Sequence, residues 1–297
     1  MSDFAPVVGI ALGGGGARGL AHIGVLKVLE REGIFPRLVA GTSMGGVIGA
    51  MYAAGLSSEQ MEAEAVKATS GRADMIRVVD VNLSQTGIVR GARIYDYIAE
   101  IIGLETKFSD LRRPLSMVAV DLNTGREVVL NSGRVADAVR ATISVPGVFK
   151  PVEIGPLHLV DGGMLNNVPV DVARKMGADV VIAVDVLPSF TQNVPGEPPV
   201  VAPLRPKRVL RAYRDLWHVV MIMTSAATEA RLQQWPPDVL LRPPVASDID
   251  VLLGFNRLQD AMAAGVAAAE AALDQILAAV GRTPRASASV TIDNNSQ

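Results

Sequence analysis

The chain has 297 residues, of which 49% are hydrophobic but only 4% aromatic, so we expect a core of aliphatic and alanine side chains. A net charge of −2 without a long Lys/Arg run excludes an electrostatic nucleic-acid binder. With no cysteine, the chain cannot hold a disulfide framework, a thiolate zinc site or a cysteine nucleophile.

The first predicted elements are a buried strand (7–12) and an amphipathic helix (20–32), joined by the loop Gly-Gly-Gly-Gly-Ala-Arg-Gly (13–19). The loop fits Gly-x-Gly-x-x-Gly, yet the next strand ends without the acid that dinucleotide binding needs, and no Gly-Lys-Ser/Thr closes a phosphate loop. Consecutive small residues can also direct several backbone N–H groups at a developing oxyanion. We favour that use, with a tight turn lacking chemistry as the alternative.

Residues 38–45 read Leu-Val-Ala-Gly-Thr-Ser-Met-Gly, which is Gly-x-Ser-x-Gly centred on Ser43. This pattern is typical of the nucleophile elbow, a strand-to-helix turn where Gly41 and Gly45 must be small because backbones crowd. The uncharged stretch 38–58 approaches the length of a membrane span, but its glycines favour a buried strand, turn and helix. The N-terminus lacks the basic and apolar regions of a signal peptide, so we expect a cytoplasmic protein, at most peripheral to the membrane.

Strands and helices continue to alternate through the middle of the chain, which predicts an α/β fold with a mostly parallel sheet. The expected elements are a capped helix start (57–60), a loop or lid (70–91), a hairpin (115–122 and 127–131), a helix (135–144), a strand (157–160), a helix (168–176) and a buried strand (180–186).

We divide the chain into a core carrying these motifs (1–187), a Pro-rich surface loop (188–208), C-terminal helices packed on the same domain (209–280) and a disordered tail (281–297). The helices are expected at 209–234 and 255–280. This last third of the chain carries no motif with a chemical interpretation.

A serine nucleophile needs a base, and none of the three histidines lies in a recognisable motif. Asp161 is the better candidate, because a strand ends at it and Gly162 and Gly163 leave room around its carboxylate. The alternative is an ordinary Asp-Gly-Gly turn.

Three motifs thus occur in a fixed order: the glycine loop (14–19), the elbow (41–45) and Asp-Gly-Gly (161–163). With the flanking segment from Ala141 to Pro169, this order resembles the patatin-like phospholipase family, and most of all the bacterial branch similar to the catalytic domain of neuropathy target esterase. The resemblance covers about residues 7–186. It implies a three-layer α/β/α hydrolase fold with a mostly parallel central sheet.

The resemblance also implies a Ser-Asp dyad without a catalytic histidine, with Ser43 as nucleophile and Asp161 as base. A carboxylate with a pKa of about 4 is a poor base for serine, so we predict direct contact in a partly desolvated cleft that raises the pKa of Asp161. The residues implied to form or brace the oxyanion hole are Gly14, Gly15, Gly16, Ala17 and Arg18.

The implied activity is hydrolysis of fatty-acid esters through an acyl-enzyme, with lysophospholipids or single-chain esters favoured over bilayer phospholipid. We expect a lipid substrate, at most a transient membrane contact through an apolar stripe at 217–223, no nucleic acid, no cofactor and no metal, hence no calcium dependence. The oligomeric state, acyl chain length and headgroup have no signal in the sequence. Two alternatives stay open: a regulatory or scaffold protein on the same fold, and an acyltransferase, which would need a histidine partner and an arginine.

Overall fold

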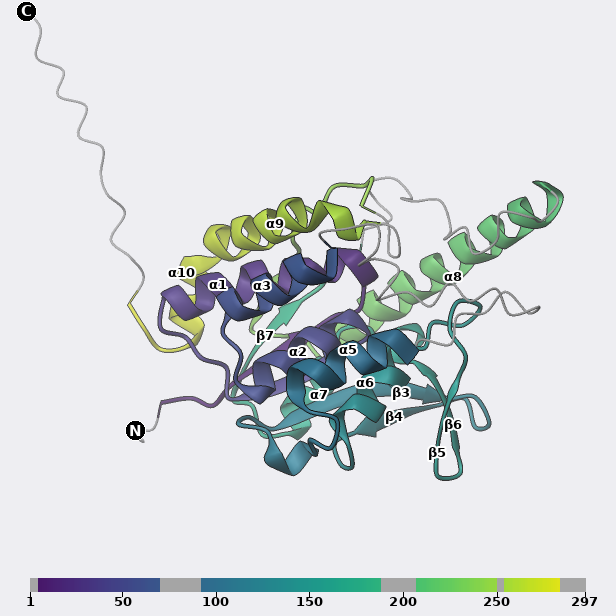
Figure 1. Ribbon diagram of the computed structural model, residues 1–297. Helices are drawn as coiled ribbons and strands as arrows, with labels where there is room; N and C mark the ends of the chain where they lie inside the picture. Colours follow the sequence, from purple (N-terminus) through teal and green to yellow (C-terminus); the bar gives the residue numbers. More distant parts are fainter. Residues whose placement is uncertain (1–4, 70–91, 188–206, 250–253, 284–297) are drawn as a thin grey trace, which may run out of the picture.

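The computed structural model describes residues 5–69, 92–187, 207–249 and 254–283, and Figure 1 shows them around one central sheet. The sheet has eight strands in the order β5-β6-β3-β2-β1-β7-β8, with β4 beside β3. Strands β3, β2, β1, β7 and β8 run parallel, whereas β4, β5 and β6 pair antiparallel. The strands are β1 (Val8–Leu12), β2 (Leu38–Thr42), β3 (Leu115–Asp121), β4 (Arg126–Leu130), β5 (Val152–Ile154), β6 (Leu157–Asp161), β7 (Val180–Val184) and β8 (Val239–Leu241).

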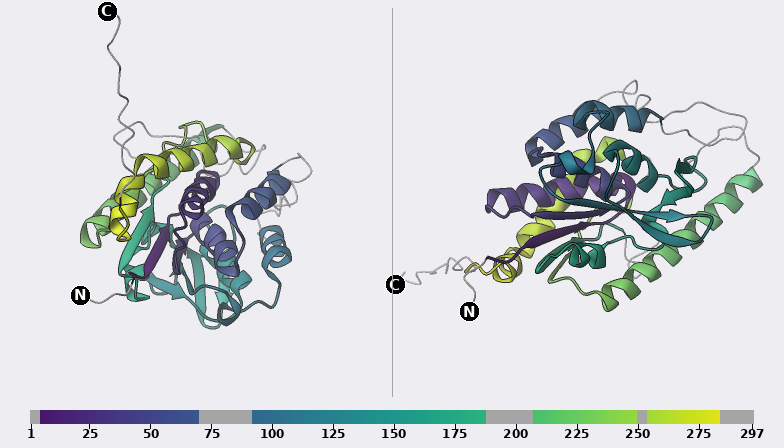
Figure 2. Two further views of the ribbon diagram at one scale, coloured as in Figure 1. Left: turned by 90° about the vertical axis from the view of Figure 1, so that its left-hand side faces the viewer. Right: turned by 90° about the horizontal axis from the view of Figure 1, so that it is seen from below.

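Helices cover both faces of this sheet, as the two views of Figure 2 show. They are η1 (Gly16–Leu20), α1 (Ala21–Arg31), α2 (Met44–Ala54), α3 (Ser58–Thr69), α5 (Ala92–Ile102), η2 (Phe108–Asp110), α6 (Val135–Thr142), η3 (Gly162–Met164), α7 (Val170–Lys175), α8 (Lys207–Gln234), η5 (Phe255–Arg257), α9 (Leu258–Ala271) and α10 (Leu273–Ala279). The predicted three-layer α/β/α fold with a mostly parallel sheet is therefore confirmed.

Successive residues of the parallel strands feed two separate cores, because side chains alternate between the faces of a sheet. On β1, Ile10 and Leu12 join the core formed with α1, α2 and α9. Ala11 lies on the other face, in a thinner core with α7 and with Leu232 of α8. Both faces of β1 are thus buried, which explains its unbroken run of apolar residues.

Helices α1 and α9 cross so closely that glycine is required on each. A Cβ atom at Gly24 would overlap the carbonyl of Met262, and one at Gly265 would overlap the carbonyl of Ala21. Within the described ranges, no single helix has the length and apolar composition needed to cross a membrane. Only the bent pair of α9 and α10 reaches that length and composition, with a 60° break between them.

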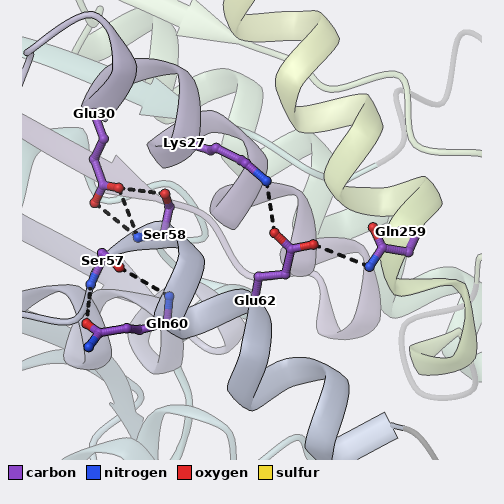
Figure 3. Close-up of polar contacts among 7 residues, drawn as sticks. All are labelled: Lys27, Glu30, Ser57, Ser58, Gln60, Glu62 and Gln259. Atoms are coloured by element: carbon purple, nitrogen blue, oxygen red, sulfur yellow. Dashed lines mark hydrogen bonds and ion pairs between the residues drawn. The ribbon is translucent and has the colours of Figure 1, made fainter.

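Polar side chains join α1, α3 and α9 at their solvent edge (Figure 3). The predicted cap is present at the start of α3, where the Ser57 N–H donates to Gln60 Oε1 (2.9 Å) and the Gln60 N–H donates to Ser57 Oγ (3.2 Å). The Ser58 N–H donates to Glu30 of α1 at 3.0 Å. These contacts complete the open N-terminal turn of α3, so they are explained without a ligand.

The C-terminal third differs from its sequence prediction in two respects. The one helix expected at 255–280 is divided into η5, α9 and α10, with a 60° break before α10. Only helices were expected in this third, yet β8 extends the sheet by pairing parallel with β7. Three residues are too few for an alternating pattern to be recognised, so this strand had no detectable signal. The expected loop or lid at 70–91, the Pro-rich loop except for 207–208, and the tail from 284 lie outside the described residues.

Candidate active site

The Gly-x-Ser-x-Gly motif forms a sharp turn between β2 and α2. Ser43 has φ 54° and ψ −124°, and among the described residues it is the only non-glycine with positive φ. Its carbonyl accepts the N–H groups of Gly46 (2.8 Å) and Val47 (3.1 Å), which begins α2. A Cβ at Gly41 would lie 2.5 Å from the Gly45 carbonyl oxygen, so the motif glycines are needed for close approach. The backbone strain is concentrated at the residue that carries the hydroxyl.

A threonine from a distant helix holds this turn from outside. The Ser43 N–H donates to Thr142 Oγ1 at 2.9 Å, and that hydroxyl donates in turn to the Val118 carbonyl at 2.5 Å. No motif in the sequence indicated a role for Thr142. It could have been recognised only as a polar residue at the buried end of the predicted helix 135–144.

Strand β3 brings Asp161 next to Ser43. Thr42 at the end of β2 pairs with Val118, and Asp161 at the end of β6 pairs with the next β3 residue, Ala119. Because β4 occupies the opposite edge of β3, β2 and β6 share one edge. Strand β6 runs antiparallel to β3, so its carboxyl end points at the carboxyl end of β2. Two residues far apart in the sequence therefore meet.

The carboxylate of Asp161 lies in a desolvated position, with the residue only 6% exposed. Burial raises the pKa of Asp161 to about 6, while hydrogen bonds from the Ser43 hydroxyl and the Gly163 N–H (2.8 Å) oppose that rise. A carboxylate with a pKa near neutrality that contacts a serine hydroxyl can accept its proton. This arrangement has the geometry that the sequence analysis expected of the pair.

Ser43 and Asp161 open into a cavity of about 270 Å³ that one helix walls with apolar side chains. Its α8 lining is Leu216, Trp217, Val220, Met221 and Thr224. The stripe expected at 217–223 is therefore divided, since Trp217, Val220 and Met221 face the cavity while Val219, Ile222 and Met223 are exposed. None of the chain's three histidines lines the cavity.

The glycine loop forms the opposite wall, through Gly14, Gly15 and Gly16. The Gly14 N–H donates to the Asn167 carbonyl at 3.2 Å, so this amide is engaged. The N–H groups of Gly15 and Gly16 have no hydrogen-bond partner among the described residues. They are the loop amides available to a group bound beside Ser43.

Arg18 turns away from the cavity and ties the loop to the C-terminal part of the chain. Its guanidinium donates to the carbonyls of Val186 (2.8 Å), Val245 (3.1 Å), Ala246 (3.0 Å) and Ile249 (3.4 Å). Burial lowers the pKa of Arg18 to about 10, with Asp185 opposing. Of the two roles expected for Arg18, its side chain has the geometry of a brace. Ala17 likewise does not line the cavity.

The sequence pattern of the Patatin-like phospholipase family matches residues 10–174, more than half of the chain. The chain belongs to the patatin-like phospholipase family.

Its relatives include several named as members of the NTE family. An uncharacterized NTE family protein of Mycobacterium tuberculosis is 39% identical over 181 residues, 61% of this chain and 49% of that protein. A second from the same organism is 34% identical over 277 residues, 90% of this chain and 46% of that protein. Mouse patatin-like phospholipase domain-containing protein 6 is 37% identical over 183 residues, 60% of this chain and 13% of that protein. The chain thus spans about half the length of the mycobacterial relatives.

Among solved structures, the chain is similar to VipD of Legionella pneumophila, with a TM-score of 0.49 and 14% identity over 91% of this chain and 67% of that one. It is also similar to the type III effector ExoU, with a TM-score of 0.45 and 15% identity over 92% of this chain and 54% of that one.

Proposed function

We propose that the protein is a serine hydrolase of fatty-acid esters that works through a Ser43–Asp161 dyad. The observation that carries this proposal is the contact between the Ser43 hydroxyl and a buried carboxylate of raised pKa, inside a cavity that no histidine lines. The family's name, Patatin-like phospholipase, agrees with a lipid substrate.

The reaction follows from these positions. Ser43 Oγ attacks the ester carbonyl carbon while its proton passes to the Asp161 carboxylate, and that proton then leaves with the alcohol. Water next attacks the acyl-enzyme, again giving a proton to Asp161, and the fatty acid is released with Ser43 restored. During each attack the carbonyl oxygen becomes negative, and in this proposal the amides of Gly15 and Gly16, two residues that line the cavity, bind it. We exclude the amide of Gly14 from this role because Asn167 already occupies it.

The cavity lining contributed by α8 favours an acyl chain as the group next to the ester. Trp217, Val220 and Met221 present apolar surface to the cavity, whereas a polar headgroup would have few partners there. We therefore propose a single-chain lipid ester, such as a lysophospholipid, as the substrate class. Val219 and Met223, which are exposed on the same helix, would meet a lipid aggregate only transiently.

The first test is hydrolysis of nitrophenyl esters of graded chain length and of a lysophospholipid. Ser43→Ala and Asp161→Asn should each lower kcat by at least about 10³-fold, as for a nucleophile and its base. A triple substitution of the histidines that keeps the fold should still turn over. A silent wild type that a phosphonate fails to label at Ser43 would exclude the hydrolase and favour the scaffold alternative.

The pH profile tests the base. Because Asp161 accepts a proton only when ionised, kcat/KM should rise with pH and level off above about 6. Below that point it should fall by about tenfold per pH unit. A profile that is flat across this range would show that Asp161 is not the base.

A further inference from the structure

Residues 13–16 of the glycine loop carry no side chains, so their peptide groups depend on neighbours. Glycine visits many backbone conformations, and Gly16 here has φ 54°. An oxyanion hole lowers a barrier only when its donors already point at the site before the reaction.

His22 holds the peptide between Gly13 and Gly14. It lies in the first turn of α1, is fully buried, and places Nε2 at 2.7 Å from the Gly13 carbonyl oxygen. A carbonyl can only accept, so Nε2 carries the proton. The other ring nitrogen, Nδ1, is buried and has no hydrogen-bond partner among the described residues. Within that part of the chain, the polar contact of this histidine is thus with the loop.

Asn167 holds both of the peptides that flank the Gly14 Cα atom. Its Nδ2 donates to the Gly14 carbonyl at 3.3 Å, and its own carbonyl accepts the Gly14 N–H at 3.2 Å. Its Oδ1 would lie 2.7 Å from a Cβ at Gly14 and 3.0 Å from one at Gly163. The space beside both glycines is therefore filled by this amide.

These contacts determine where the free N–H groups point, because C=O and N–H lie on opposite sides of a trans peptide. With the Gly14 carbonyl directed at Asn167, the Gly15 N–H is directed the opposite way. The Gly15 carbonyl accepts the Arg18 N–H at 3.1 Å, which orients the Gly16 N–H in the same manner.

We propose that His22 and Asn167 are positioning residues that fix the two peptides from Gly13 to Gly15, so that the amide of Gly15 faces the cavity before substrate binds. This inference rests on the proposed hydrolase function and assigns both residues a task in it. Neither residue transfers a proton: His22 acts through Gly13, and Asn167 acts through Gly14. Their loss should slow the chemical step rather than weaken binding.

The test compares His22→Leu with His22→Gln, whose amide nitrogen can replace the Nε2 donor. Active sites are first counted by phosphonate labelling of Ser43, so that kcat refers only to folded enzyme. With a short soluble ester, His22→Leu and Asn167→Ala should each lower kcat by about 10- to 100-fold. This is part of the rate loss that follows when an oxyanion donor is removed entirely. KM should change little, and His22→Gln should recover most of the rate. His158→Gln, at a partly exposed histidine of β6, is the control.

Non-additivity gives a second readout. Because both residues hold one loop, the double variant should lose less than the product of the two single effects. If His22→Leu does not fold, Asn167→Ala alone tests the inference. Unchanged kcat per labelled site, or a purely KM effect, would overturn the inference and leave the hydrolase proposal intact. Failure of wild type to label or turn over would count against the hydrolase proposal itself.

Discussion

The two loops that meet at the cavity are built in opposite ways. The conformation of the elbow at Ser43 is determined mainly by residues next to it in the sequence, since Gly41 and Gly45 permit the close approach of the backbone and the Ser43 carbonyl accepts the first hydrogen bonds of α2. The glycine loop is held by His22, which follows it closely in the sequence, and by distant contacts from Asn167 and from the carbonyls that bind Arg18. A strained turn can be encoded locally, whereas four consecutive glycines need tertiary contacts to hold one conformation.

The largest effect should come from the elbow's own glycines. Gly45→Ala places a Cβ against the Leu12 carbonyl, where rigid backbone offers no relief, so the free energy of unfolding should fall by at least about 3 kcal/mol. The matched control is Gly49→Ala in the same helix, whose Cβ would be 3.0 Å from a Val39 methyl that can shift. Urea denaturation measures both. Equal stabilities would mean that the elbow does not depend on this close approach.

The carboxylate beside the elbow and the histidine beside the glycine loop should respond to acid with opposite signs. The pKa of Asp161 is raised from 3.8 to about 6, so its charge lowers the stability above pH 6, and this cost disappears progressively as pH falls from about 6 to 3.8. The pKa of His22 is lowered by burial from 6.5 to about 4, so stability present above pH 6.5 is lost as pH falls toward 4. Each shift corresponds to about 3 kcal/mol.

Unfolding at pH 8 and at pH 4 tests these signs. Asp161→Asn should raise the free energy of unfolding at pH 8, by up to about 3 kcal/mol, and His22→Gln should flatten the loss between pH 6.5 and 4. If Asp161→Asn is no more stable than wild type at pH 8, the carboxylate is not desolvated as described.

A smaller effect should come from Thr142, a distant residue that supports the elbow. Thr142→Val keeps the shape but leaves the buried Ser43 N–H and the Val118 carbonyl unpaired, which should cost about 1–3 kcal/mol. Thr142→Ser, which keeps the hydroxyl, should recover most of that stability. Thermal unfolding of the two variants measures this difference in stability, and identical melting temperatures would show that the elbow does not need the Thr142 hydroxyl.

The smallest effect is expected from a chelator. The proposed chemistry uses only Ser43, Asp161 and backbone amides, so EDTA should change kcat by less than about twofold. The same assay run with added calcium is the control. A loss of activity that calcium restores would contradict the dyad mechanism.

Sequence alone determined the strand and helix alternation and the elbow at Ser43, and it made Asp161 the candidate base, because these depend on periodicity and on small residues at fixed spacing. Only the tertiary structure decided which groups meet there. The pairing of β2 and β6 along one edge of β3 places Asp161 at Ser43. Contacts across the sheet select Asn167, Thr142 and the orientation of Arg18. Such contacts join residues 99 to 168 positions apart, so no local sequence pattern can predict them.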